Sequence, residues 1–263
     1  MSRKLCWPSR WFDHFFADPN HPLEDQPGTF VNVVSAYRWQ TDHDSGSEFN
    51  VHAKAELPNA QQRLTLMVRN DAEQDDQLHN DLASRPEEVG KRKTGGFRSA
   101  LRWVVKTSDR MDIDLDAGVR SKLRTFFRAR YRYKHLMPGE VTWFRFTQKG
   151  YWEDPKGFGS SSLFELDRPI TPRSSFRFST EFEFTEENNE AGRGWYMSQG
   201  VAFYTRLGRR SGVSVYAGYD AYTQPVAAVE TIRTGVRFRR SVWRPWFYYE
   251  VEPYLLCPRD ENY

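Results

Sequence analysis

Residues Met111–Lys134 read MDIDLDAGVRSKLRTFFRARYRYK, and their pattern decides the fold. In the first half every second residue is acidic, and in the second half every second residue is basic. The acidic positions are Asp112, Asp114 and Asp116, and the basic positions are Arg128, Arg130, Arg132 and Lys134. The residues between them are apolar or aromatic. A period of two is the signature of β-strands whose two faces differ in polarity, so the stretch predicts two amphipathic strands.

A hairpin about Lys122 brings the acidic strand opposite the basic one. The opposite-charge pairs are then Asp112 with Arg132, Asp114 with Arg130, and Asp116 with Arg128. The apolar residues meet on the other face. Cross-strand pairs each contribute roughly 0.2–1 kcal/mol, so charge and hydrophobicity favour one register. An ordinary exposed hairpin with a solvated charged face has the same pattern, and the rest of the chain must decide between the two.

The composition favours a large sheet with unlike faces. The chain has 263 residues, of which 16% are aromatic and 28% are charged, and its net charge is +3. This length allows one large β domain or two small ones. No run approaches the roughly 18–20 apolar residues that a transmembrane helix needs. Many aromatic and many charged residues together are typical of strands with an apolar outer face and a charged inner face.

The alternation continues along the chain and predicts thirteen strands. Besides the two strands of the hairpin they are Val31–Gln40, Phe49–Leu57, Arg63–Asn70, Phe97–Lys106, Val141–Thr147, Ser162–Arg168, Ser174–Thr185, Trp195–Arg206, Val213–Tyr222, Thr231–Arg239 and Trp246–Leu256. No helical connection is expected between them, which predicts an antiparallel meander. Tight turns alternate with longer polar connections at 41–47, 71–96, 148–161, 186–194 and 223–228. This asymmetry is typical of membrane barrels, which have short periplasmic turns and longer outer loops.

Two arguments place the apolar face outside. A barrel of thirteen or more strands is too wide for side chains to fill. Aromatic residues also gather near strand ends, as in the girdles at membrane interfaces. They are Trp39, Tyr133, Trp143, Trp195, Tyr219, Tyr222, Trp243 and Trp246. The alternative is a soluble β-sandwich or a lipocalin-like barrel. Over residues 30–257 the chain resembles Gram-negative outer-membrane β-barrel proteins in architecture, without a motif of one family. The resemblance implies a location in that membrane and contact with lipid.

The fold prediction is therefore an all-β, antiparallel up-and-down transmembrane β-barrel of about 14 strands. Bacterial barrels normally have an even number of strands. Either a fourteenth strand is missing at the C-terminal edge, or the weak segment Ser162–Arg168 is not a strand and twelve remain. We expect residues 1–29 to form an N-terminal periplasmic arm, either flexible or with a short helix capped by Ser9, and residues 30–263 to form the barrel. MSRKLCWPSR shows no signal peptide. Cys6 and Cys257 are expected at opposite rims and unbridged.

The charged face provides the candidate functional residues. The predicted lumen-lining residues are Asp112, Asp114, Asp116, Arg128, Arg130, Arg132, Arg233, Arg237 and Arg239. One hypothesis is a water-filled pore whose basic tracks attract small anionic or polar solutes. The other is a self-neutralised network that holds the wall and blocks the lumen, since the Asp–Arg register neutralises the hairpin and Glu250 and Glu252 can neutralise Thr231–Arg239. Such a non-conducting barrel would be structural or would bind another envelope protein.

An outer-membrane hydrolase is the third hypothesis. Its candidates are His43 with Asp42, Asp44 and Ser45, the inward-facing His52, and His79 with Asp75, Asp76 and Asp81. No nucleophile elbow and no metal-binding His pair is present, so no catalytic residue, metal site or cofactor is predicted. Nucleic-acid binding is not expected, because the basic residues are interleaved with acidic ones and form no recognition motif.

Overall fold

The computed structural model describes residues 15, 30–39, 45–56, 64–69, 98–120, 123–139, 141–244 and 247–259. The strands are β1 (Phe30–Arg38), β2 (Gly46–Glu56), β3 (Leu64–Arg69), β4 (Arg98–Thr107), β5 (Met111–Arg120), β6 (Arg124–Leu136), β7 (Trp143–Glu153), β8 (Gly157–Thr171), β9 (Ser174–Thr185), β10 (Tyr196–Arg206), β11 (Ser211–Tyr222), β12 (Ala228–Ser241), β13 (Tyr248–Val251) and β14 (Tyr254–Pro258), with one helix, α3 (Glu186–Glu190), between β9 and β10. In this part of the chain, no helix has the length and apolar character needed to cross a membrane.

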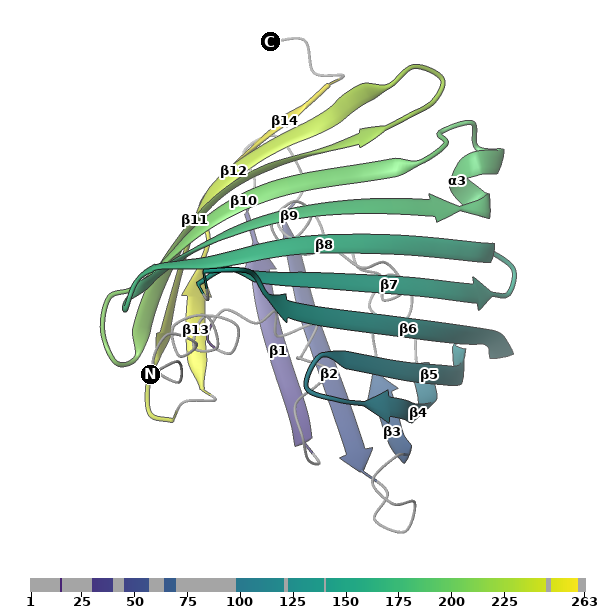
Figure 1. Cartoon of the computed structure of the whole chain (residues 1–263), viewed down its shortest axis with the longest axis horizontal. Helices are drawn as coiled ribbons and strands as arrows, with labels where there is room; N and C mark the ends of the chain where they lie inside the picture. The colour runs from purple at the N-terminus through teal and green to yellow at the C-terminus, as the bar shows by residue number, and fades with distance from the viewer. Residues whose placement is uncertain are drawn as a thin grey trace.

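The strands form one antiparallel up-and-down sheet. Each strand from β1 to β12 pairs with its neighbours in sequence, and the sheet curves into a wall around an interior (Figure 1). β13 and β14 both pair with β12 and so occupy one position in the sheet. Pro253 separates them because proline has no N–H to donate to the ladder. Its carbonyl still accepts a hydrogen bond from the Val236 N–H at 3.0 Å, which keeps the broken strand on its neighbour.

The predicted hairpin and its register are confirmed. β5 and β6 pair with Asp112 opposite Arg132, Asp114 opposite Arg130, and Asp116 opposite Arg128. The connection at Leu123 is tight, with Leu123 at a φ of 58° in the left-handed region. Alternating polarity and opposite charge therefore specified this register. A slip by one residue would move every side chain to the other face of the sheet, which is costly where the two faces differ in polarity.

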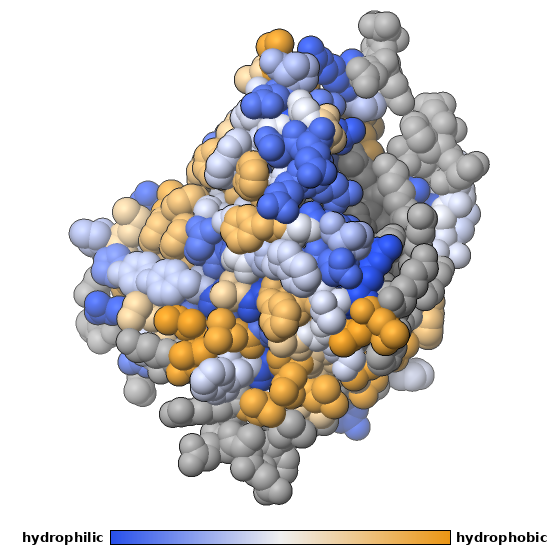
Figure 2. Space-filling view, turned by 90° about the vertical axis from the view of Figure 1, so that its right-hand side faces the viewer, coloured by the Kyte–Doolittle hydropathy of each residue, from blue (hydrophilic) through white to orange (hydrophobic). Residues whose placement is uncertain are grey.

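The two faces of the sheet have opposite characters. On what we call the inner face, charged side chains are buried: Asp114 is 1% exposed and Arg239 is 2% exposed. On the outer face, apolar side chains are open, with Val31 at 68% and Phe127 at 58% exposure. Apolar groups cover broad areas of the surface in Figure 2. A soluble sandwich or lipocalin-like barrel would bury its apolar face, so that alternative is wrong, and the apolar-out arrangement expected of a membrane barrel is confirmed.

Two of the expected connections differ from the structure. Residues 148–161 are not a long loop, because β7 continues to Glu153 and β8 begins at Gly157. The polar side chains of Lys149 and Glu153 are buried on the inner face of the sheet. In the sequence alone, a run of polar residues of this kind is easily taken for a loop. The connection after β9 contains the helix α3, although no helix was expected there. The side chain of Thr185 caps it by accepting a hydrogen bond from the Asn188 N–H at 3.0 Å.

The structure also decides between the expected strand numbers. Ser162–Arg168 lies inside the 15-residue strand β8, which pairs along its length with β7 and β9, so the twelve-strand alternative is wrong. Among the described residues, β1 pairs with β2 and β13 and β14 pair with β12, and no pairing joins β1 to either of them. A fourteenth strand between these edges stays a prediction.

Most of the expected N-terminal arm and Cys6 lie outside the described residues. Of the arm only Phe15 is described, and its backbone is helical. Cys257 is exposed and its thiol is free.

Candidate functional site

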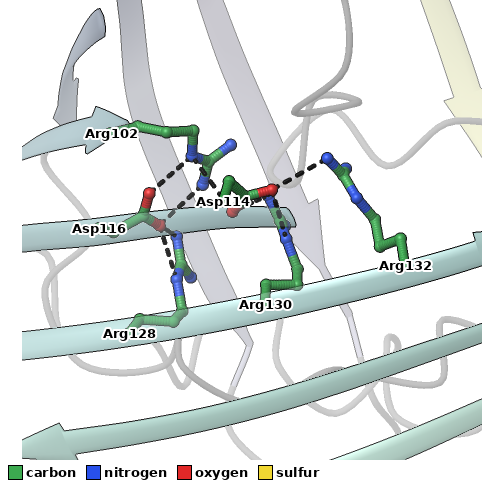
Figure 3. Close-up of polar contacts among 6 residues, drawn as sticks. All are labelled: Arg102, Asp114, Asp116, Arg128, Arg130 and Arg132. Atoms are coloured by element: carbon green, nitrogen blue, oxygen red, sulfur yellow. Dashed lines mark hydrogen bonds and ion pairs between the residues drawn. The ribbon is translucent and has the colours of Figure 1, made fainter. Parts of the chain in front are cut away.

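Two buried aspartates on the inner face of β5 hold four arginines (Figure 3). Asp116 on β5 accepts hydrogen bonds from Arg102 on β4, Nε to Oδ1 at 2.7 Å and Nη2 to Oδ2 at 2.9 Å. On the other side Asp116 Oδ2 accepts from Nε of Arg128 on β6 at 2.7 Å and also from its Nη2. The two guanidinium groups therefore clamp one carboxylate and join three strands. Such charge-assisted hydrogen bonds are roughly twice as strong as those between neutral groups.

Asp114 is the second centre of this network. Both of its oxygens accept from Nη2 of Arg130 at 3.1 Å. Its Oδ2 also accepts from Nη2 of Arg132 at 3.0 Å. Arg132 thus turns to the diagonal aspartate and not to Asp112, the partner expected from the register. Asp112 is half-buried, and its side chain has no hydrogen bond or ion pair with any described residue. The long side chain of Arg132 can reach a diagonal neighbour across the strand pair. It therefore shares the buried carboxylate of Asp114 with Arg130.

The three arginines predicted on β12 form a second ladder. Arg237 donates to Glu252, Nε to Oε2 at 2.9 Å and Nη2 to Oε1 at 3.1 Å. Arg239 Nε donates to Glu250 Oε2 at 2.7 Å. Arg233 forms an ion pair with Asp220 on β11. The expected neutralisation of β12 by Glu250 and Glu252 is therefore confirmed, and Asp220 is a further partner that the sequence pattern did not indicate.

Phe15 is part of the surroundings of the second ladder. Its side chain packs against Ala202, Tyr204 and Tyr216, which form a buried cluster on β10 and β11. Its carbonyl oxygen accepts a hydrogen bond from Nη1 of Arg239. A residue far from β12 in the sequence therefore contacts the inner face, and no periodicity in residues 1–29 could have indicated this contact.

Further charged groups on the inner face escaped the sequence analysis because β7 was taken to end at Thr147. Arg120 Nη1 lies 3.0 Å from Glu153 Oε1, with both side chains 3% exposed. The Tyr151 hydroxyl donates to Glu183 Oε1 at 3.1 Å. The strict alternation of Lys149, Tyr151 and Glu153 was the signal that could have extended the strand.

A smaller group joins β7, β8 and β9. Asp167 accepts a hydrogen bond from Arg177 Nε at 2.6 Å, and Arg145 Nη2 lies 2.6 Å from its other oxygen. The Arg145 side chain is 28% exposed and that of Arg132 is 23% exposed, so both are more open than the buried arginines around Asp116. These two guanidinium groups are the most exposed of their ion-pair networks.

Of the residues proposed for a hydrolase, the structure describes His52 and Ser45. His52 is buried in β2, opposite Asn32 and Arg69 in the register. Ser45 is exposed in the connection before β2. The other candidates, His43, His79 and their neighbouring aspartates, lie outside the described residues. Within the described ranges no three His, Cys, Asp or Glu side chains are grouped to hold a metal ion.

Comparisons with known proteins identify no family for this chain, so its architecture is judged from its own geometry. No family model matches the sequence, and no curated protein matches it. The crystal structure of Acinetobacter baumannii OccAB4 is similar at 9% sequence identity and a TM-score of 0.44, over 88% of this chain and 68% of that chain. This likeness is too distant to carry an argument. The antiparallel meander, the apolar outer face and the buried charged inner face together are the architecture of an outer-membrane β-barrel protein.

Proposed function

We propose that the chain forms a channel for small anionic solutes in the outer membrane of a Gram-negative bacterium. The observation that carries the proposal is the gathering of four arginines around Asp114 and Asp116 on the inner face. Guanidinium groups in this number would create a positive field beside a solute that passes them. A confined path with low-dielectric walls strengthens such a field and raises the local concentration of anions.

The proposal assigns different roles to the arginines. Arg102 and Arg128 are held on both sides of Asp116 and serve to fix the wall. Arg132 and Arg145 are the most open guanidinium groups of their networks and would contact the passing solute. Conduction requires that a solute bind strongly enough to enter the channel and weakly enough to leave it. A solute that exchanges between several such arginines would meet both conditions.

Planar-bilayer conductance of the purified protein tests this function. We expect steady conductance and a reversal potential in a salt gradient that indicates anion selectivity. Arg132→Gln together with Arg145→Gln should lower the selectivity for anions. Arg168→Gln removes one positive charge at an exposed site near the end of β8 and should leave the selectivity unchanged. Cation selectivity of the unaltered protein would contradict the proposal.

A non-conducting barrel is the second candidate, and two observations favour it. Of the nine predicted lumen-lining residues, all except Asp112 make ion pairs or hydrogen bonds with other described residues. Phe15 also lies against the inner face at β10 and β11. A protein that inserts into bilayers as a folded barrel and gives no conductance would support this candidate over the channel.

A further inference from the structure

Three short connections lie side by side at one end of the sheet. They join β8 to β9, β10 to β11 and β12 to β13. Backbone hydrogen bonds tie the middle connection to both of its neighbours. The Arg206 N–H donates to the Arg173 carbonyl at 2.8 Å, on one side. On the other side, the Ser241 N–H donates to the Arg210 carbonyl at 2.9 Å. Strands are about 4.8 Å apart and consecutive connections are two strands apart, so the three extend over roughly 19 Å.

This end of the sheet carries exposed positive charge without acidic residues beside it in the sequence. Segments 169–174, 205–211 and 239–247 contain no Asp and no Glu. We call their exposed arginines the basic rim: Arg173, Arg209, Arg210, Arg240 and Arg244. Arg210 Nη1 donates to the Val242 carbonyl at 2.9 Å, which joins two of the connections. The side chains of the other four make no hydrogen bond or ion pair with any described residue, so their guanidinium groups are open to a ligand.

Aromatic and apolar side chains are exposed on the same connections. Trp243 is 79% exposed, and its ring stacks on Phe247 with the centroids 6.0 Å apart. Leu207 is exposed in the middle connection. Arg240 lies on the outer face of β12, opposite the exposed Tyr249. Aromatic rings beside long basic side chains are typical of a membrane interface, where the rings lie at headgroup level and the charged ends extend to the headgroups.

The rim continues the apolar outer face of the sheet. Phe203 on β10 lies opposite Val215 on β11, and both are exposed on that face within a few residues of the middle connection. A lipid whose chains contact this face therefore has its headgroup near the rim. On the inner face, Glu250 of β13 is paired with Arg239 at 2.7 Å. Short connections of bacterial barrels lie on the periplasmic side, which faces the phospholipid leaflet.

We propose that the basic rim, together with Trp243 and Phe247, binds the headgroups of anionic phospholipids. Arginine binds phosphate oxygens with two parallel N–H groups, and clustered basic residues at a membrane surface attract anionic lipids. The stacked rings favour a lipid over a soluble phosphate, because they add apolar contact next to the charge. The surface lies on the outer side of the barrel, so this interaction is separate from the proposed conduction.

Native mass spectrometry of the folded protein in a non-ionic detergent tests the surface. The protein is mixed with equimolar phosphatidylglycerol and phosphatidylcholine that have the same acyl chains, and the bound lipids are counted. We expect phosphatidylglycerol to be retained about threefold more often or better, because only its headgroup has a net negative charge. The double variant Arg209→Gln with Arg244→Gln should lose most of this preference.

A matched double variant controls for the loss of charge itself. Arg193→Gln with Arg259→Gln removes two exposed positive charges at the opposite end of the strands and should keep the preference. Arg209→Lys with Arg244→Lys keeps the charge and should retain more of the preference than the Gln pair. Far-UV circular dichroism verifies that each variant has folded. Equal retention of the two lipids by the unaltered protein overturns the proposal, and so does an equal loss in the two Gln pairs.

Competition with lipopolysaccharide separates the two leaflets of the outer membrane, because lipopolysaccharide also carries phosphate groups. We expect it to displace phosphatidylglycerol equally well from the unaltered protein and from the Arg209→Gln, Arg244→Gln variant. Displacement that requires the intact rim would place the rim in the lipopolysaccharide leaflet and overturn the assignment to phospholipid. The conductance measurement is independent of these results, since a silent protein that prefers phosphatidylglycerol keeps the lipid surface and contradicts only the channel.

Discussion

Arg102 donates two hydrogen bonds to Asp116, from Nε at 2.7 Å and from Nη2 at 2.9 Å, and both side chains are almost completely buried. This pair connects β4 to β5 on the face where the charged residues gather. Buried ion pairs gain little over apolar residues of the same shape, but the loss of one partner leaves an uncompensated charge. The pair therefore defines how the inner face should respond to mutation.

We predict that Asp116→Asn lowers the free energy of unfolding by about 3–5 kcal/mol, because it removes the buried negative charge that both Arg102 and Arg128 contact. Asp112→Asn is the matched control on the same strand and should change stability by less than about 1 kcal/mol, since Asp112 has no ion pair with a described residue. Urea titration of the protein folded in lipid vesicles, followed by tryptophan fluorescence, measures both. Equal losses for the two variants would contradict the network.

The hairpin shows how far the sequence alone could lead. Its register followed from charge and polarity because both faces of β5 and β6 carry an unbroken two-residue pattern. The diagonal bond from Arg132 to Asp114 did not follow, since strand pairing fixes Cα positions and leaves a long side chain a choice of partners. Register reasoning of this kind finds rows of residues more reliably than it finds individual contacts.

Strand ends and irregular segments were harder to predict. The end of β7 was missed because Lys149 and Glu153 are polar, and polarity indicates a loop only when the inner face of a sheet is apolar. The break at Pro253 and the helix α3 depend on local backbone chemistry, which periodicity does not contain. Phe15 packs on the cluster of Ala202, Tyr204 and Tyr216, which is far from it in the sequence, so only the tertiary structure reveals this packing.

The outer face gives the second prediction. Leu115 is 39% exposed on the apolar side of β5. If this side contacts the hydrocarbon core, Leu115→Arg should lower the stability of the folded protein in lipid vesicles by about 2–4 kcal/mol. Leu123→Arg, in the exposed connection between β5 and β6, should cost about 1 kcal/mol or less. A negligible loss for Leu115→Arg would mean that this part of the face is not in the membrane core.

A third prediction concerns the free thiol. Cys257 is exposed and lies opposite Ile232 in the register. We expect the variant Cys6→Ser to react with one equivalent of a maleimide reagent in detergent without prior reduction. Mass spectrometry of the intact protein counts the added groups. Wild-type protein that reacts only after reduction would show that Cys257 is bridged, against the expectation that Cys6 and Cys257 are apart.

The last prediction concerns the close contact between Gly235 and Tyr216, which are directly opposite each other on β12 and β11. A Cβ at residue 235 would lie 2.5 Å from the Tyr216 hydroxyl oxygen and 2.6 Å from Cζ, so the ring would have to move. The ring is 2% exposed, and its hydroxyl donates to Glu252 Oε1 at 2.8 Å, which leaves little room for movement. Moving it would also disturb the hydrogen bond that Arg237 donates to Glu252.

Gly235→Ala should therefore lower the free energy of unfolding by about 1–3 kcal/mol, as overpacking typically does. Gly150→Ala is the control, because a Cβ at residue 150 meets no atom within 4 Å. This second substitution should be neutral or stabilising by up to about 1 kcal/mol, since alanine restricts the unfolded chain more than glycine does. Urea titration in vesicles compares the two. If Gly235→Ala is as stable as Gly150→Ala, then Tyr216 is free to move, and the ladder of Arg237 and Glu252 does not depend on its position.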